Sequence, residues 1–203
     1  MKLYNAALPA PNPRRVRIFL AEKGLSLPLE DVSIRERAHK SPEFRQKNSL
    51  GQLPVLALDD GTHLSESVSI CRYLEELHPE PPLFGRSALE RANVDMWIRR
   101  LEMTVMTPVG AVWVHTHPFT ARLGTQYKDY GESNRERYAR ALQWLDRELE
   151  GREFVTGGAF SMADIIGLVT LDFATFIGLE LPADTPHLHA WHARVSARPS
   201  ATA

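Results

Sequence analysis

The chain has 203 residues, and 24 Lys and Arg stand against 25 Asp and Glu, which gives a formal net charge of −1. Hydrophobic residues make up 43% and charged residues 24%, so disorder over most of the length is excluded. The balanced charge leaves no electrostatic footprint for nucleic acid or an acidic membrane surface, and we expect neither as a partner.

The single cysteine, Cys71, excludes an internal disulfide and a cysteine-rich zinc site. It lies beside Ile70 and Leu74 on the apolar side of a predicted helix, where we expect packing. Residues 1–5 carry no signal-peptide core, and no run of about 20 apolar residues predicts a membrane span. We therefore expect a cytoplasmic protein.

The first 80 residues alternate strand and helix signals in the order βαβαββα. The strand signals cover residues 2–4, 27–32, 53–58 and 62–64, and the helix signals cover residues 14–24, 41–47 and 65–77. Gly24 is placed to end the first helix, and Ser41 to cap the second. Tyr4 lies within the first strand, where we expect it to pack.

The residues after this region have a different character. Pro79, Pro81 and Pro82 predict a stiff linker. The rest of the chain shows helical periodicity, which predicts helices over 88–115 with an interruption at Pro108, over 133–150, from after Phe160, and over 186–197. We therefore predict an α/β domain over 1–78, a linker over 79–87 and an all-helical domain over 88–203.

Ser161 and Asp164 form a capping box, in which Asp164 reaches back to the N–H of Ser161. This pattern predicts a structural role, namely the start of a buried helix.

Three motifs of the first domain suit a ligand. The backbone of Gln52, Leu53 and Pro54 precedes a strand and is placed to pair with an extended peptide, although an ordinary loop has the same pattern. Glu66 and Ser67 begin a helix, whose N-terminus favours an anion while Glu66 favours an ammonium group. That pair suits an α-amino acid, and plain N-capping is the alternative.

His39 and Lys40 end a charged loop. Either cation suits a ligand carboxylate, and a solvated loop is the alternative.

These motifs occur in one order, and with them the chain resembles the cytosolic glutathione S-transferase family over nearly its whole length. The segments that carry the resemblance are residues 14–24, 40–44, 51–56, 65–67 and 160–165. The resemblance implies a thioredoxin-like domain with a cis peptide bond before Pro54, then an all-helical domain, in a homodimer. It also implies glutathione as the co-substrate.

The resemblance assigns one part of glutathione to each motif. Gln52 and the Leu53 backbone would hold the cysteinyl part. Glu66 and Ser67 would hold the γ-glutamyl end. His39 and Lys40 would lie near the glycyl carboxylate.

The loop over residues 5–13 departs from the family, because it lacks the Tyr, Ser or Cys that usually contacts the glutathione sulfur. We expect Asn12 to cap the first helix and Pro13 to occupy its first position. The N–H groups of Arg14 and Arg15 would then stabilise the thiolate, which is the nucleophile.

This loop resembles an atypical branch of the family, in which a water held partly by a histidine of the helical domain serves the sulfur. The candidates are His117 and, second to it, His115. Their spacing suits a metal, but no third ligand is evident nearby, and we expect no metal.

The predicted function is a glutathione transferase, as used in detoxification, that joins the glutathione thiolate to small hydrophobic electrophiles. The electrophile is expected between the domains, near Leu8, Trp113 and His117. Two alternatives remain open: glutathione-dependent isomerisation or peroxide reduction, and a non-catalytic binding or regulatory protein with the same fold.

Overall fold

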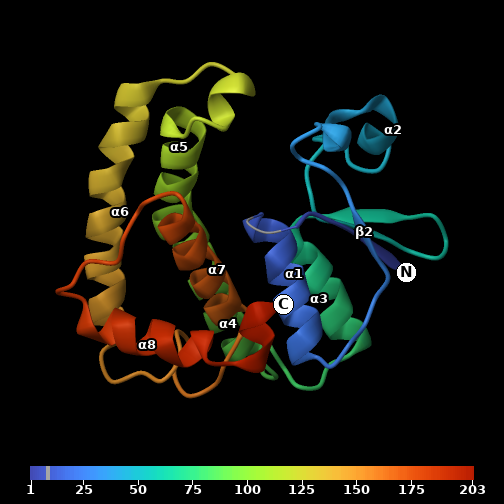
Figure 1. Cartoon of the computed structure of the whole chain (residues 1–203). Coiled ribbons are helices and arrows are strands. Elements are labelled where there is room, and N and C mark those ends of the chain that lie inside the picture. Colours follow the sequence, from blue (N-terminus) through green and yellow to red (C-terminus); the bar gives the residue numbers. More distant parts are fainter. Residues whose placement is uncertain (8–9) are drawn as a thin grey trace. The chain divides into compact units, whose positions relative to one another are not determined.

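The computed structural model describes residues 1–7 and 10–203, which divide into two units (Figure 1). The first unit is Met1–Leu83 together with Pro199–Ala203, and the second is Phe84–Arg198. The division after Leu83 falls inside the predicted linker. The last five residues, which we predicted to belong to the helical domain, group with the first unit instead. There the Arg14 guanidinium donates to the Ala201 carbonyl at 2.7 Å.

The first unit is built on a four-stranded mixed sheet in the order β2-β1-β3-β4. Its strands are β1 (Lys2–Asn5), β2 (Leu29–Asp31), β3 (Val55–Ala57) and β4 (His63–Ser65). β1 runs parallel to β2 and antiparallel to β3, and β3 runs antiparallel to β4. With the helices between them, the strands confirm the βαβαββα order of a thioredoxin-like domain.

Helices cover both faces of this sheet. On one side, α1 (Pro11–Glu22) and α3 (Ser67–Leu77) pack against each other, as Figure 1 shows. On the other side lies α2 (Pro42–Arg45), preceded by the short helix η1 (Ala38–Lys40). Ser41 caps α2 as predicted, because its Oγ accepts from the N–H of Phe44 at 3.2 Å.

The alternation of side chains along β1 divides the core between these two faces. Leu3 is fully buried, whereas Tyr4 points to the opposite side of the pleat. There its ring meets Phe44 of α2 edge-on, with ring centroids 5.7 Å apart, and both pack with Val55. Tyr4 therefore packs in the core, as expected.

The second unit is entirely helical apart from its connections. It contains α4 (Ala88–Arg100), the π-helical η2 (Leu101–Met106), α5 (Thr107–Thr116), the short η3 (Thr120–Arg122), α6 (Lys128–Leu149), α7 (Met162–Phe176) and α8 (Pro186–Ser196). A last short helix, η4 (Pro199–Thr202), packs against α1 in the first unit. Among the described residues, no helix is both long enough and apolar enough to span a membrane.

One helix boundary differs from the sequence prediction, and one predicted break is confirmed. The long helix expected over 88–115 is interrupted by η2 before Pro108, as predicted, because proline has no N–H for the preceding turn. The helix expected to begin at residue 133 begins at Lys128. Its first turn is held by packing, since the Tyr130 ring lies 5.4 Å from that of His115 on α5.

The start of α7 shows the predicted capping arrangement. Both the N–H and the hydroxyl of Ser161 donate to Asp164 Oδ2, at 2.9 and 3.1 Å. Oδ1 accepts from the Val155 N–H at 2.8 Å and from Trp191 Nε1 at 2.9 Å. Burial raises the pKa of Asp164, and these four donors oppose the shift. The box is therefore a buried junction that ties three segments of the helical unit together.

Candidate functional site

Three chain segments meet at one end of the sheet in the first unit. The register of β1 against β3 pairs Tyr4 with Val55, so the chain that continues past these residues brings Asn5 beside Pro54. The register of β3 against β4 pairs Val55 with Ser65, which brings Pro54 beside Glu66. The residues predicted to bind the γ-glutamyl and cysteinyl parts are thus neighbours, although they are more than ten positions apart in sequence.

The N-terminus of α3 forms the first wall of this site. Glu66 occupies the N-cap position with a φ of +67°, and Ser67 is the first helical residue. Ser67 is buried, and its Oγ lies 3.4 Å from a guanidinium nitrogen of the buried Arg15 on α1. Free N–H groups, a hydroxyl and a carboxylate are therefore side by side, which is the donor and acceptor set that an α-amino acid group requires.

The segment before β3 forms the second wall. The Leu53–Pro54 peptide bond is cis, which confirms the expectation from the resemblance. Leu53 precedes β3, so its backbone groups lie beyond the strand ladder. The loop before Leu53 is held in place by a hydrogen bond, in which the buried Asn48 side chain donates to the Gln52 carbonyl at 2.9 Å.

His39 and Lys40 lie against this same segment. A Cβ on Gly51, whose φ is +56°, would come within 2.6 Å of the His39 carbonyl, so only glycine allows this close approach. Lys40 Nζ donates to the Leu50 carbonyl at 2.9 Å. His39 Nδ1 is buried without a hydrogen-bond partner among the described residues. The structure therefore brings both predicted cations to the Gln52 loop.

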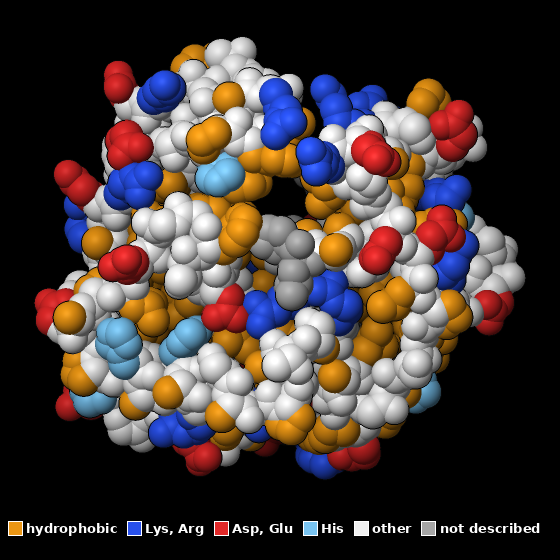
Figure 2. All heavy atoms as spheres, in the orientation of Figure 1, with side chains coloured by type: hydrophobic (Ala, Val, Ile, Leu, Met, Phe, Trp, Pro, Cys, Tyr) orange, Lys and Arg blue, Asp and Glu red, His pale blue; other side chains and the backbone are white. Residues whose placement is uncertain are grey.

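Positive charge is concentrated at this edge. Figure 2 shows Lys and Arg side chains gathered over α2 and the turn before it. The pKa of Lys40 is lowered first by burial and then by the neighbouring charges of Arg45 and Arg37. Burial also lowers the pKa of His39, and the charge of Lys40 adds to that shift. A bound carboxylate would relieve this repulsion.

The start of α1 corrects one prediction. The helix begins at Pro11 with Ala10 as its N-cap, so Asn12 is not the cap and Pro13 is the third helical residue. Proline at the first position fixes φ for the helix and starts it earlier than Asn12 would. The N–H groups of Arg14 and Arg15 then fall after the first turn, where intrahelical acceptors are available.

Two prolines in the first turn leave few donors there. Pro11 and Pro13 have no N–H, and the Ala10 N–H donates to the Ala7 carbonyl at 3.3 Å. The N–H of Asn12 is the donor that remains in this turn. Leu8, predicted to contact the electrophile, lies outside the described residues.

In the helical unit, Trp113 and His117 come together at the end of α5. Their rings lie 4.3 Å apart, and Phe119, Phe173 and Phe176 surround Trp113 at centroid distances of 5.8, 5.4 and 6.4 Å. This aromatic cluster, defined by these five residues, offers an apolar surface with one polar ring.

The two histidines of this region have different surroundings. His117 Nδ1 accepts from the Phe119 N–H at 3.1 Å, so a neutral ring carries its proton on Nε2. His115 faces α6 instead, where its ring packs against Tyr127 and Tyr130. Its Nδ1 accepts from the Tyr127 N–H at 3.3 Å. Of the two predicted histidines, His117 is therefore the one beside Trp113.

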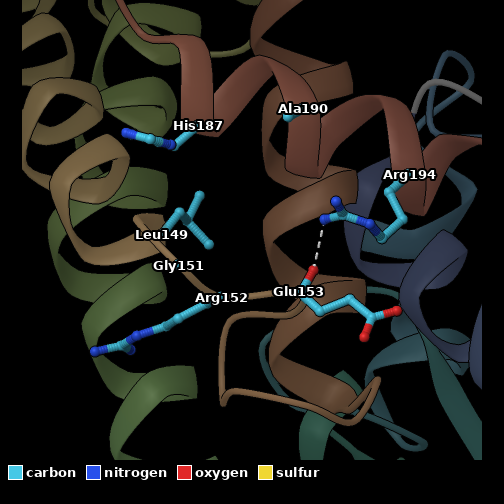
Figure 3. A pocket seen from close by; sticks show the side chains of 7 residues that line it. All are labelled: Leu149, Gly151, Arg152, Glu153, His187, Ala190 and Arg194. Carbon is cyan, nitrogen blue, oxygen red and sulfur yellow. Dashed lines mark hydrogen bonds between the residues drawn. The ribbon is translucent and has the colours of Figure 1, made fainter.

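A hollow of about 320 Å³ lies where α6 ends beside α8 (Figure 3). None of the predicted site residues lines it. Arg194 donates to the Glu153 carbonyl at 2.8 Å, and Arg152 donates to the Val155 carbonyl at 3.3 Å. Both arginines that line the hollow are thus engaged by the protein itself.

The sequence points to the backbone N–H of Arg15 but not to its side chain, which the structure places against Ser67. Its position offered a signal, because Arg15 lies three and four residues before the buried Ile18 and Phe19 and so shares the apolar face of α1. Asn48 was also missed, and its single polar side chain in a loop carries no comparable signal. Among the described residues, no group of three His, Cys, Asp or Glu is placed to hold a metal.

A thioredoxin-like unit with this site, followed by an all-helical unit, is the fold of glutathione transferases. Residues 10–77 match the family model described as glutathione S-transferase, N-terminal domain, and residues 101–199 match the one described as glutathione S-transferase, C-terminal domain. The chain belongs to the glutathione S-transferase family.

Individual relatives agree with this assignment. The chain is 37% identical over 197 residues to glutathione S-transferase 2 of Saccharomyces cerevisiae, covering 94% of this chain and 83% of that protein. It is 36% identical over 188 residues to human glutathione S-transferase theta-2, covering 91% and 76%. The crystal structure of Gtt2 from Saccharomyces cerevisiae matches with a TM-score of 0.93 at 35% identity, covering 100% of this chain and 99% of that one.

Proposed function

We propose that this chain conjugates the thiolate of glutathione to small hydrophobic electrophiles. The observation that carries the proposal is the meeting of Asn5, Leu53–Pro54 and Glu66–Ser67 at one end of the sheet. Glutathione is a short extended peptide with an α-amino acid group at one end and a carboxylate at the other. The site has a matching partner for each part.

The γ-glutamyl group is assigned to the start of α3. Its carboxylate accepts from the N-terminal N–H groups and from Ser67, and its ammonium pairs with Glu66. The cysteinyl backbone pairs with Leu53 beside Gln52. The glycyl carboxylate lies toward His39 and Lys40, where the repulsion between neighbouring cations favours an anion.

The glutathione sulfur has no Tyr, Ser or Cys side chain to donate to it from the loop over residues 5–13. We assign the first stabilising donor to the N–H of Asn12, supported by the lack of an N–H at Pro11 and Pro13. The atypical activation expected from the sequence, by a water held at His117, stays part of this proposal. It is supported by the Nε2–H that the hydrogen bond at Nδ1 leaves to His117.

The electrophile is assigned to the aromatic cluster around Trp113. Its rings bury apolar surface, and Phe176 remains 54% exposed, so the cluster has an accessible side. The thiolate attacks the electrophilic carbon and forms a carbon–sulfur bond. With an aryl halide, the halide leaves with the bonding electron pair and the thiol proton passes to solvent.

We also propose that the chain forms a homodimer. Leu89 and Met96 of α4 and Met103 of η2 recur every seven residues and are 80%, 40% and 61% exposed. This spacing places them on one side of the helical segment as an apolar stripe. A second copy of the chain is the partner that the family resemblance implies. The cytoplasmic location likewise stays a prediction.

The test combines retention on glutathione–agarose with conjugation of a model aryl halide. Glu66→Ala removes the partner of the ammonium group, and we expect glutathione to bind about tenfold more weakly or worse. Glu76→Ala is the matched control, because Glu76 is an exposed glutamate near the other end of α3. In the same assay, His117→Ala should lower turnover more than binding.

The outcomes separate the candidate functions. Retention with turnover supports the transferase, whereas retention without turnover on a panel of electrophiles favours the binding protein. An unchanged glutathione Kd in Glu66→Ala would refute the assignment of the γ-glutamyl end. No retention of the unmodified chain would refute the glutathione site.

A further inference from the structure

A network of hydrogen-bonded polar side chains lies at the end of β1, where the chain leaves the sheet. Asn5, the last residue of β1, is 4% exposed, and its Nδ2 donates to Asp31 Oδ1 at 2.6 Å. Its Oδ1 accepts from an Arg17 guanidinium nitrogen at 2.6 Å. The amide of Asn5 thus joins a carboxylate on β2 to a guanidinium on α1, and both halves of the amide are satisfied.

The same nitrogen of Arg17 also donates to the Ala6 carbonyl at 3.1 Å. Ala6 is the first residue after β1, and the Asn5 carbonyl beside it accepts from the Val32 N–H at 2.8 Å. These hydrogen bonds fix the backbone from side chains on α1 and from the chain that follows β2. Arg17 and Val32 therefore fix the direction in which the chain leaves β1 toward α1.

Burial and a neighbouring positive charge disfavour the charged form of Arg17 in this position. Burial lowers the pKa of Arg17, the charge of Arg14 adds to that shift, and the charge of Asp31 opposes it. A partly desolvated guanidinium near a second cation requires its two oxygen acceptors. An ordinary surface arginine would extend into water instead.

The sheet register relates this network to the glutathione site. The ladder of β1 with β3 ends at the pair of Tyr4 and Val55, so Asn5 and Ala6 leave the sheet at the same end at which Leu53 and Pro54 enter it. Leu53 is the residue whose backbone is assigned to the cysteinyl part of glutathione. The backbone held by Arg17 therefore lies next to the part of the ligand that carries the sulfur.

We propose that Arg17 is a positioning residue for the reaction, and that it acts through Asn5, Asp31 and the Ala6 carbonyl. It touches neither glutathione nor the electrophile. It holds the chain after β1 in place beside the segment that is assigned to the cysteinyl part of glutathione. This inference rests on the proposed transferase function, because it assigns a role within that same site.

The test begins with Arg17→Met, which keeps the apolar stem and removes the guanidinium. Misplacing a reacting group costs up to about a hundredfold in rate, so we expect kcat to fall by about ten- to a hundredfold. The absorbance of the bound thiolate should appear at a higher pH than in the unmodified protein. The Kd for glutathione should stay within about twofold, since the end groups bind elsewhere.

Two further variants separate positioning from stability. In Arg17→Lys, one ammonium still donates to Asn5 Oδ1 and to Ala6, and most of the lost turnover should return. Asn5→Asp alone places a carboxylate against Asp31 and should lose activity. The double change Asn5→Asp with Asp31→Asn exchanges the amide and the carboxylate, so every donor again has an acceptor and the net charge equals that of the unmodified protein. This double variant should regain the activity that Asn5→Asp loses.

Lys2→Met is the control, because this change also removes one positive charge from the first unit. Lys2 pairs with Glu30 on the neighbouring edge strand and does not take part in the hydrogen bonds to Ala6. Its kcat should equal that of the unmodified protein. If Arg17→Met loses thermal stability while kcat and the thiolate titration stay unchanged, Arg17 is a structural residue and the inference is wrong. If the unmodified chain conjugates no electrophile, the proposed function fails first, and the inference falls with it.

Discussion

At the scale of single residues, the environment of Cys71 decides what its thiol does. The side chain is fully buried on α3, and burial raises the pKa of the thiol above its ordinary value of 9.0, with Glu75 adding to the shift and Arg15 opposing it. The thiolate is the reactive form of cysteine, and a buried thiol that keeps its proton is inert. Cys71 therefore contributes packing, and the chemistry of the site is left to the sulfur of the ligand.

We predict that a thiol reagent at pH 8 does not label Cys71 in the folded chain and labels it fully after denaturation. The pH dependence has a definite sign. The folded chain keeps a proton that the unfolded chain loses, so this group stabilises the fold below pH 9.0 and that contribution declines above it. Denaturant titrations at rising pH measure the decline, and Cys71→Ala should lack it. Rapid labelling of the folded chain would contradict the prediction.

At the scale of elements, one glycine sets how closely two helices approach. A Cβ on Gly131 of α6 would come within 2.5 Å of Thr116 Cγ2 and 3.0 Å of His115 Cβ, both on α5. Interiors are close-packed, so an added methyl group at this contact must push the helices apart. The first turn of α6 depends on this approach, because its aromatic side chains pack on His115.

We predict that Gly131→Ala lowers the free energy of unfolding by about 1–3 kcal/mol, despite the better helix propensity of alanine. Gly110→Ala is the matched control, since Gly110 lies within α5 and a Cβ there meets nothing within 4 Å. That change should raise stability by about 0.5–1 kcal/mol. Thermal or denaturant unfolding of both variants measures the two changes in free energy of unfolding. If the two changes have the same sign and size, the close approach of α5 and α6 at Gly131 does not limit the size of the side chain there.

At the scale of the whole molecule, a buried lysine holds the chain where it leaves the first unit. Lys23 Nζ donates to the His78 carbonyl at 2.8 Å and the Pro81 carbonyl at 2.5 Å, and pairs with Glu75 Oε2 at 2.5 Å. Glu75 Oε1 accepts from the Leu83 N–H at 2.9 Å. Each of the three ammonium protons has an acceptor, so the connection after α3 is fixed by one pair of side chains.

We predict that Lys23→Met destabilises the chain by about 3–5 kcal/mol, because it leaves the Glu75 carboxylate buried without its ammonium partner. Lys2→Met again serves as the control, since it breaks an ion pair that is exposed to solvent, and its unfolding midpoint should change little. Hydrogen exchange should show the loss of protection at Leu83 in Lys23→Met. A midpoint as little changed as that of the control would refute the role of the pair.

Much of the fold was predictable because its signals are local. Alternating apolar residues, the prolines and the caps at Ser41 and Ser161 predict the strand and helix order, since each depends on neighbours a few positions away. The boundaries that failed depend on contacts across the chain. The early start of α6 needs its packing on α5, and the last five residues join the first unit through contacts such as that of Arg14 with Ala201.

The candidate site divides in the same way. Residue identity and spacing alone reveal the motifs at His39–Lys40, Gln52–Pro54 and Glu66–Ser67. They also reveal the lack of a Tyr, Ser or Cys in the first loop and the resemblance to the family. Three features emerge only from the folded chain: α1 begins at Pro11, Arg15 contacts Ser67, and Arg17 holds the end of β1. The physical reason is that a side chain's partners are chosen by sheet register and helix packing, which join residues far apart in the sequence.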